Sequence, residues 1–70
     1  MMEIIAKRIK ELRKEKGITQ VELAKAIGIS QAIVSQYENS IYEPTASIIV
    51  KLADYFGVCT DYLLGRQDWY

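Results

Sequence analysis

Apolar residues recur at helical spacing near the start of the chain. Ile5, Ile9 and Leu12 are separated by three or four residues, and charged residues lie between them. This spacing places the three side chains on one face of a helix. Gly17 follows, and glycine readily adopts the left-handed backbone at which helices commonly end. The pattern therefore predicts a first helix that ends at Gly17.

The next two predicted helices are short, and each begins after a capping residue. Thr19 and Glu22 have the spacing of a capping box, in which each side chain accepts a hydrogen bond from the other residue's backbone N–H. The helix that follows ends at Gly28. Ser30 is the next N-cap, and its helix runs to about Glu38. Helices of about eight residues are not stable alone, so tertiary packing must hold this pair.

A fourth helix follows an irregular stretch at residues 39–44. Thr45 is its predicted N-cap and Gly57 its end. Its inward-facing residues are Ile49, Leu52, Ala53 and Phe56. A short fifth helix opens at Thr60-Asp61 and ends at Gly65.

Five helices joined by short turns predict a compact all-α domain over residues 1–70, with residues 66–70 as a short tail. Half of the residues are apolar (50%), which is typical of globular domains and argues against disorder. No apolar run approaches the ~20 residues that span a bilayer. Charges close to the N-terminus argue against a signal peptide. We therefore expect a globular protein that does not insert into a membrane.

The inventory of reactive side chains is poor. Histidine is absent and Cys59 is the single cysteine, so neither an internal disulfide nor a zinc cluster is expected. For Cys59, a buried apolar role is favoured over a reactive thiol. We expect no enzymatic activity, no metal, no cofactor and no small-molecule substrate. A single unpaired cysteine also fits the reducing cytoplasm, which is the expected location.

Charge is distributed unevenly although the net charge is zero. Residues 1–16 hold six basic and three acidic side chains, and residues 17–70 hold three basic and six acidic ones. Many DNA-binding domains carry a basic excess, so the zero sum does not favour DNA binding by itself. The polarised distribution is more compatible with it.

Residues 19–38 have the pattern of a helix-turn-helix. The turn Gly28-Ile29 joins two capped helices, and Ala24 is small where the helices approach each other. Ile29 and Val34 are expected to fill the angle between them.

The outer face of the second of these helices carries no charge. Val34 and Tyr37, helped by Ile33, form its inner stripe. The opposite stripe consists of Gln31, Ala32, Ser35, Gln36 and Asn39. Glutamine can bond to the N6 and N7 atoms of adenine, serine to several base edges, and alanine can touch the thymine methyl. These side chains are therefore better suited to base edges than to phosphates. The alternative interpretation is that this side of the helix is an ordinary solvated surface.

Several short motifs occur in a characteristic order between residues 5 and 64. They are Ile9-Lys10-Glu11-Leu12-Arg13, Gly17-Ile18-Thr19-Gln20, Glu22-Leu23-Ala24, Gly28-Ile29-Ser30-Gln31, Val34-Ser35-Gln36-Tyr37-Glu38, Pro44-Thr45 and Asp61-Tyr62-Leu63-Leu64-Gly65. This ordered set resembles the Cro/cI-type, or XRE-like, helix-turn-helix family of phage repressors and bacterial regulators. The resemblance implies a compact five-helix, lambda-repressor-like fold that binds double-stranded DNA.

The resemblance also implies roles for single residues. Gln20 corresponds to a glutamine that grips a phosphate and braces the first side chain of the recognition helix; the alternative is a plain first-turn residue. Asn39 and the backbone at Ser40 correspond to phosphate contacts, and Lys10 is the cation expected to reach the DNA backbone. The base-reading positions correspond to Gln31, Ala32, Ser35 and Gln36. For Ser35 the alternative is a neutral surface hydroxyl.

Arg13 and Glu38 resemble the family's partly buried ion pair, which fixes the angle of the recognition helix. Ser40 is a departure, because the family usually has glycine there and serine tolerates the left-handed conformation less well. Either Asn39 takes that conformation or the loop differs, so phosphate contacts at residues 40–42 are in doubt. Glu43 would repel DNA if it faced the backbone.

We expect a sequence-specific regulator, a repressor, that binds a palindromic operator as a homodimer. The dimer interface is assigned to Tyr62, Leu64, Trp69 and Tyr70. Aromatic residues are enriched at interfaces, whereas Trp69 could instead fold back onto its own domain. The rival function is an antitoxin-like or cofactor-like module that docks onto another protein, which the zero net charge and the aromatic tail favour.

Overall fold

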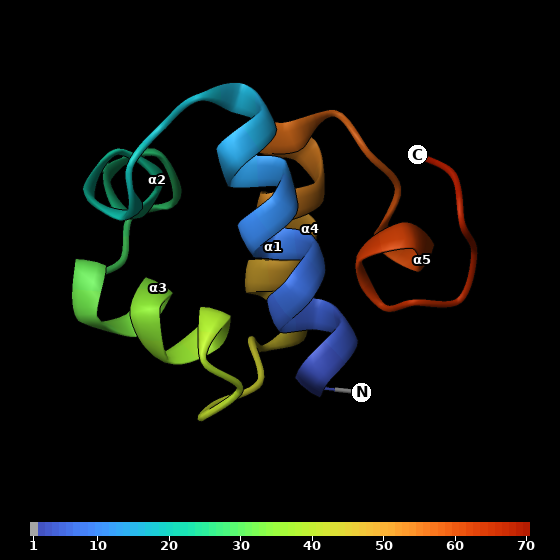
Figure 1. Cartoon of the computed structure of the whole chain (residues 1–70), viewed down its shortest axis with the longest axis horizontal. Helices are drawn as coiled ribbons and strands as arrows, with labels where there is room; N and C mark the ends of the chain where they lie inside the picture. The colour runs from blue at the N-terminus through green and yellow to red at the C-terminus, as the bar shows by residue number, and fades with distance from the viewer. Residues whose placement is uncertain (1) are drawn as a thin grey trace.

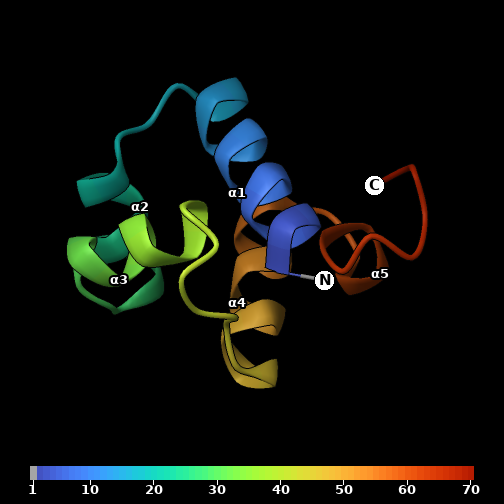
Figure 2. The same cartoon turned by 60° about the horizontal axis from the view of Figure 1, so that its bottom comes forward.

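The computed structural model describes residues 2–70 and contains five α-helices, with no strand in that part of the chain. The helices are α1 (Met2–Lys16), α2 (Gln20–Ile27), α3 (Gln31–Glu38), α4 (Ala46–Phe56) and α5 (Thr60–Leu63). Helix α1 runs through the centre with α4 behind it, α2 and α3 lie on one side, and α5 lies on the other (Figure 1). In the turned view α4 lies below α1, with α2 and α3 still on one side and α5 on the other (Figure 2). The predicted all-α class is confirmed.

All three predicted N-caps are confirmed. The side chains of Thr19, Ser30 and Thr45 each accept a hydrogen bond from the backbone N–H three residues on, and Thr19 and Glu22 form the full capping box. The fifth helix differs, because Cys59 is its N-cap and makes no side-chain capping bond. Thr60 is therefore the first helical residue, which agrees with the predicted opening of the helix at Thr60-Asp61.

The core is formed by apolar residues from all five helices. Ile9, Leu23 and Leu63 are fully enclosed, so α1, α2 and α5 each bury at least one large side chain completely. Burial of such a side chain stabilises the folded state by about 1.5–3 kcal/mol. Because helices of this length do not persist alone, this shared core fixes α2 and α3 relative to α1.

Three predicted inward residues are more exposed than expected. Ile33 is 37% exposed, so it lies at the edge of the inner stripe of α3 and not within it. Phe56 and Cys59 are half-buried at the boundary of the core. The turn of the helix-turn-helix agrees better with prediction, since Ala24 and Val34 are buried and Ile29 is half-buried.

Residues after α5 turn back along α1. The guanidinium of Arg8 donates hydrogen bonds to the backbone carbonyls of Tyr62 (2.6 Å) and Gln67 (2.7 Å) and stacks over the Tyr62 ring at 4.0 Å. The carbonyl of Tyr70 accepts a bond from the Cys59 amide at 2.8 Å. These bonds hold the tail across α5. None of the helices in residues 2–70 has the length and apolar character to cross a membrane.

Candidate nucleic-acid interface

The turn between α2 and α3 sets the outward face of α3. Gly28 adopts φ 86°, which a side chain would disfavour, and the next amide, of Ile29, donates to the carbonyl of Ala24 at 3.0 Å. The chain therefore reverses sharply, and α3 begins at once. Its outer residues differ in exposure, since Gln31 and Ala32 are exposed while Ser35 and Gln36 are half-buried. All four lie on the surface that the turn directs outward.

Arg13 of α1 and Glu38 of α3 form an ion pair in the interior. Their side chains are 13% and 1% exposed. Arg13 donates through Nε to Oε2 (2.7 Å) and through Nη2 to Oε1 (3.0 Å), and its Nη1 donates to the carbonyl of Ile18 (2.9 Å). The hydrogen bond to Glu38 raises the pKa of Arg13 above its ordinary value. This two-point contact ties the end of α3 to α1.

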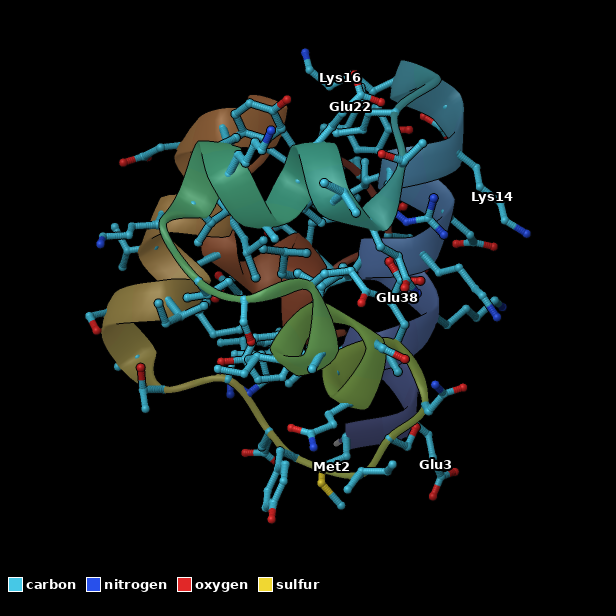
Figure 3. The ribbon with its side chains drawn as sticks, turned by 90° about the vertical axis from the view of Figure 1, so that its left-hand side faces the viewer. Met2, Glu3, Lys14, Lys16, Glu22 and Glu38 are labelled. Carbon is cyan, nitrogen blue, oxygen red and sulfur yellow. The ribbon has the colours of Figure 1, made fainter. Side chains whose placement is uncertain are left out.

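Gln20 joins this ion pair to the outer face. Its Nε2 donates to Oε1 of Glu38 at 3.1 Å, and its Oε1 accepts a bond from Nε2 of Gln31 at 2.6 Å. Figure 3 shows Glu38 between the ribbons of α2 and α3, beside α1. Hydrogen bonds therefore lead from the interior to the surface through Arg13, Glu38, Gln20 and Gln31. We call these four side chains the amide chain, after its two glutamines. The bond between Gln20 and Gln31 is the bracing that the family resemblance implies.

Asn39 is bound to its own helix. Its Nδ2 donates to the carbonyl of Ser35 at 2.8 Å and to the Ser35 hydroxyl at 3.2 Å. The donors that a phosphate would need are therefore occupied, whereas the hydroxyl hydrogen of Ser35 remains available to an acceptor. A phosphate contact by Asn39 requires its side chain to leave Ser35.

Ser40 itself takes the left-handed conformation, with φ 61°. Its amide donates to the carbonyl of Tyr37 (3.2 Å), and the Ile41 amide donates to that of Gln36 (2.9 Å). This pair of bonds is the Schellman ending of a helix, which normally uses glycine at the left-handed position. The expectation that Asn39 adopts this conformation, or that the loop departs from it, is wrong. Because both amides are occupied, the hydroxyl is the donor that Ser40 offers to a phosphate.

Basic side chains serve two different purposes. Arg8 and Arg13 are 12% and 13% exposed and are engaged within the protein. Lys10 is exposed and lies one turn before Arg13, so it projects from nearly the same side of α1. Lys14 points outward from the body (Figure 3), and the ammonium of Lys16 lies 5.0 Å from the centre of the Tyr55 ring. The exposed positive charge of α1 is consequently smaller than its six basic residues suggest.

The loop after α3 adds apolar and acidic surface beside the outer face. Ile41 is 58% exposed and Tyr42 is 60% exposed, and Glu43 is exposed as well. No basic residue occurs among residues 39–45. This loop therefore supplies no cation to the candidate interface.

The four residues assigned to a dimer interface are not equally accessible. Tyr62 and Leu64 are half-buried, and the Tyr62 ring is covered by Arg8 and by the edge of Tyr70, whose ring centre lies 4.9 Å away. Tyr70 is 56% exposed, and its hydroxyl donates to Glu15 at 2.9 Å. Trp69 is 69% exposed, so its ring does not fill a gap in the core. The tail folds back, but its tryptophan faces outward.

Residues 2–70 contain no group of three or more histidine, cysteine, aspartate or glutamate side chains gathered as metal ligands. Sequence reasoning missed the bond of Gln20 to Glu38, beside the interface, and the bonds of Arg8 to the tail, on the other side of α1. The bond from Gln20 to Glu38 joins residues 18 apart with no recurring spacing, and the bonds of Arg8 join residues more than 50 apart. Neither has a local signal in the sequence.

A family model described as helix-turn-helix matches residues 9–63. The HTH-type transcriptional regulator ImmR of Bacillus subtilis is 38% identical over 64 residues, which are 91% of this chain and 50% of ImmR. The uncharacterized HTH-type transcriptional regulator YazB of Bacillus subtilis is 43% identical over 61 residues, which are 87% of this chain and 88% of YazB. The chain thus spans about half the length of ImmR and most of the length of YazB.

Two solved structures are also similar. The P22 c2 repressor protein, in complex with a synthetic operator, superposes with a TM-score of 0.80 at 34% identity, covering 84% of this chain and 89% of that one. The N-terminal DNA-binding domain of SinR from Bacillus subtilis superposes with a TM-score of 0.82 at 32% identity, covering 89% and 91%. The predicted repressor-like fold is confirmed.

Proposed function

Since this chain belongs to the helix-turn-helix family of transcriptional regulators, we propose that it is a sequence-specific DNA-binding repressor whose helix α3 reads the major groove. Gln31, Ala32, Ser35 and Gln36 are the proposed base-reading residues. Gln20, Lys10 and the Ser40 hydroxyl are the proposed phosphate contacts, together with Asn39 once it releases Ser35. The similarity to the P22 c2 repressor, whose crystal structure is that of a complex with a synthetic operator, supports DNA binding.

The observation that carries this proposal is the uncharged outer face of α3, from which Gln31 is held in place by Gln20 at 2.6 Å. The bond fixes a glutamine at the exposed first position of α3, where a ligand can reach it. Fixing a side chain before binding reduces the entropy lost on contact with a base. Amide groups also match base edges, since glutamine can bond to both N6 and N7 of adenine.

We also propose that the protein binds as a symmetric dimer on two half-sites about one helical turn, ~34 Å, apart. The exposed rings of Trp69 and Tyr70 support an interface at the tail. Tyr62 and Leu64 contribute less direct surface, because they are half-buried beneath it. Deleting residues 66–70 should therefore convert a dimer to a monomer in sedimentation while helix content stays nearly constant.

The experiment that tests the function is selection of bound sequences from a random DNA pool, followed by titration of the selected site. Gln31→Ala and Gln36→Ala should each weaken specific binding by ~1–3 kcal/mol and relax the preference at one position of each half-site. Lys51→Ala, at an exposed position on α4, serves as the control and should bind as wild type does. If no sequence is enriched, or if both glutamine variants bind like wild type, the assignment of α3 is wrong.

The second candidate function is a protein-docking module, and exposed Ile41, Tyr42 and Trp69 favour it. These large apolar groups lie outside the proposed base-reading face. An absence of any DNA shift at low salt, where the electrostatic part of DNA binding is strongest, would favour this alternative.

A further inference from the structure

Glu38 determines how the amide group of Gln20 is turned. A carboxylate can only accept hydrogen bonds, and Arg13 binds both oxygens of Glu38 and so holds the group in place. The group of Gln20 that faces Oε1 of Glu38 at 3.1 Å must therefore be its NH2. Its carbonyl must then face the other way, toward Gln31. The direction of the amide follows from the chemistry of the carboxylate alone.

The same reasoning continues to Gln31. The carbonyl oxygen of Gln20 can only accept, so Gln31 must turn its NH2 toward it, as the 2.6 Å contact has it. One N–H of Gln31 is thereby used within the protein. Its carbonyl oxygen and its second N–H remain for a ligand. The exposed end of the amide chain thus presents one acceptor and one donor.

The two purines differ in what they require from such a group. Adenine offers an acceptor at N7 and a donor at N6, so it matches one donor and one acceptor. Guanine offers acceptors at N7 and O6, so it requires two donors. With guanine, the carbonyl of Gln31 would face O6 without a hydrogen between them. A glutamine free of Gln20 could supply both of its N–H groups instead.

We propose that Glu38, held by Arg13, is a specificity-determining residue that acts through Gln20 and makes Gln31 select adenine over guanine. This inference rests on the proposed reading of the major groove by α3. Glu38 touches no base, and its side chain is 1% exposed. It is therefore a positioning residue, whose effect reaches the DNA through two side-chain amides.

The alternative direction of the amide chain is disfavoured at every link. If Gln20 were turned over, its carbonyl would lie 3.1 Å from the carboxylate of Glu38 with no hydrogen between them. Arg13 prevents Glu38 from moving away, because it binds both carboxylate oxygens. An isolated pair of glutamines has no such preference, since either can donate to the other. The ion pair is what removes this ambiguity.

The test measures the ratio of affinities for two oligonucleotides that differ by adenine or guanine at one position. That position is the one whose preference is lost in Gln31→Met during selection from a random pool. The wild type should favour adenine by about 5- to 150-fold, the range of a good bidentate contact. Gln20→Met should reduce this ratio to a few-fold, and a lost phosphate contact cannot account for that, because it would weaken both oligonucleotides equally.

The decisive variant is the double change Arg13→Met with Glu38→Leu. It leaves the bond between Gln20 and Gln31 possible but removes the group that sets its direction. The adenine-to-guanine ratio should fall at the Gln31 position, while discrimination at the position read by Gln36 stays at the wild-type value. Helix content and cooperative melting are measured alongside, so that only folded protein is compared.

Three results would overturn the inference. The double variant could keep the wild-type ratio, or the wild type could favour guanine at the position read by Gln31. The third result is that the double variant loses discrimination equally at the positions read by Gln31 and Gln36, as expected if the ion pair only docks α3. A wild-type protein that selects a site but shows one of these results leaves the proposed function standing. A wild-type protein that selects no sequence removes the proposed function and this inference together.

Discussion

Removing Arg13 should destabilise the domain more than any surface substitution. In Arg13→Met, the carboxylate of Glu38 stays 1% exposed but loses its cation and two of its three hydrogen bonds, keeping only the bond from Gln20. The carbonyl of Ile18 also loses a donor. An uncompensated buried charge of this kind costs about 3–5 kcal/mol. A domain of this size has a total stability of about 3.5–10 kcal/mol, so the loss is a large share of it.

Thermal and urea unfolding measure this loss directly. A domain of this size shifts its Tm by about 4–8 °C per kcal/mol, so Arg13→Met should melt at least about 12 °C lower than wild type. The double change Arg13→Met with Glu38→Leu should recover much of the difference, because an apolar pair replaces a buried ion pair at little net cost. A single variant that melts like wild type, or a double variant that is no more stable than the single one, would refute this reasoning.

Three further predictions concern the backbone, salt and pH. Ser40→Gly should stabilise the fold by about 0.5–1 kcal/mol. It relieves a left-handed strain of about 1–2 kcal/mol, which outweighs the about 0.4–1 kcal/mol lost because glycine gives the unfolded chain more entropy. Ser40→Ala, the control, should show no gain in Tm. The slope of log K against log salt should be no steeper than about −5, since Lys10 and at most two other lysines of α1 per subunit are expected to reach phosphates. A slope near −10, as an approximate value, contradicts this. Burial raises the pKa of Tyr37, and the hydrogen bond to Glu15 raises the pKa of Tyr70. The two neutral hydroxyls therefore contribute their full stabilisation below pH ~10. This stabilisation is lost as the pH rises through the pKa values of the two tyrosines in the folded protein. Phenolate absorbance and urea unfolding between pH 8 and 12, as an approximate range, measure this, and a stability that does not fall there would contradict it.

The helices were predictable because their ends are determined locally. Thr19, Ser30 and Thr45 act as caps through bonds to amides three residues away, and such bonds leave a short-range mark in the sequence. The fifth helix shows the limit of this signal. Thr60 has the hydroxyl of a cap, yet the backbone of Cys59 takes that position because the helix is placed by its packing and not by a side-chain bond.

The outer face of α3 was predictable as a pattern, but its internal order was not. An uncharged stripe is visible in the sequence, whereas the direction of the amides depends on Glu38, which approaches Gln20 only after α1, α2 and α3 have packed. Ile33 is exposed for a related reason. An eight-residue helix buries only a narrow stripe of side chains, and the helices packed against α3 determine where that stripe ends. Arg8 looked like one of several surface cations. Its partners lie at the far end of the chain, beyond the reach of any local pattern.

The way in which Arg8 holds the tail has a consequence for how this protein can change over generations. Arg8 binds carbonyl oxygens at Tyr62 and Gln67, and the Cys59 amide binds the carbonyl of Tyr70. Every amino acid carries such a carbonyl, so these three bonds do not depend on which side chains the tail displays. Trp69 can therefore be exchanged for another residue without releasing the chain from α1. Position 69 is therefore a place where evolution, or an engineer grafting a fluorescent label, can change the displayed side chain while these backbone bonds remain.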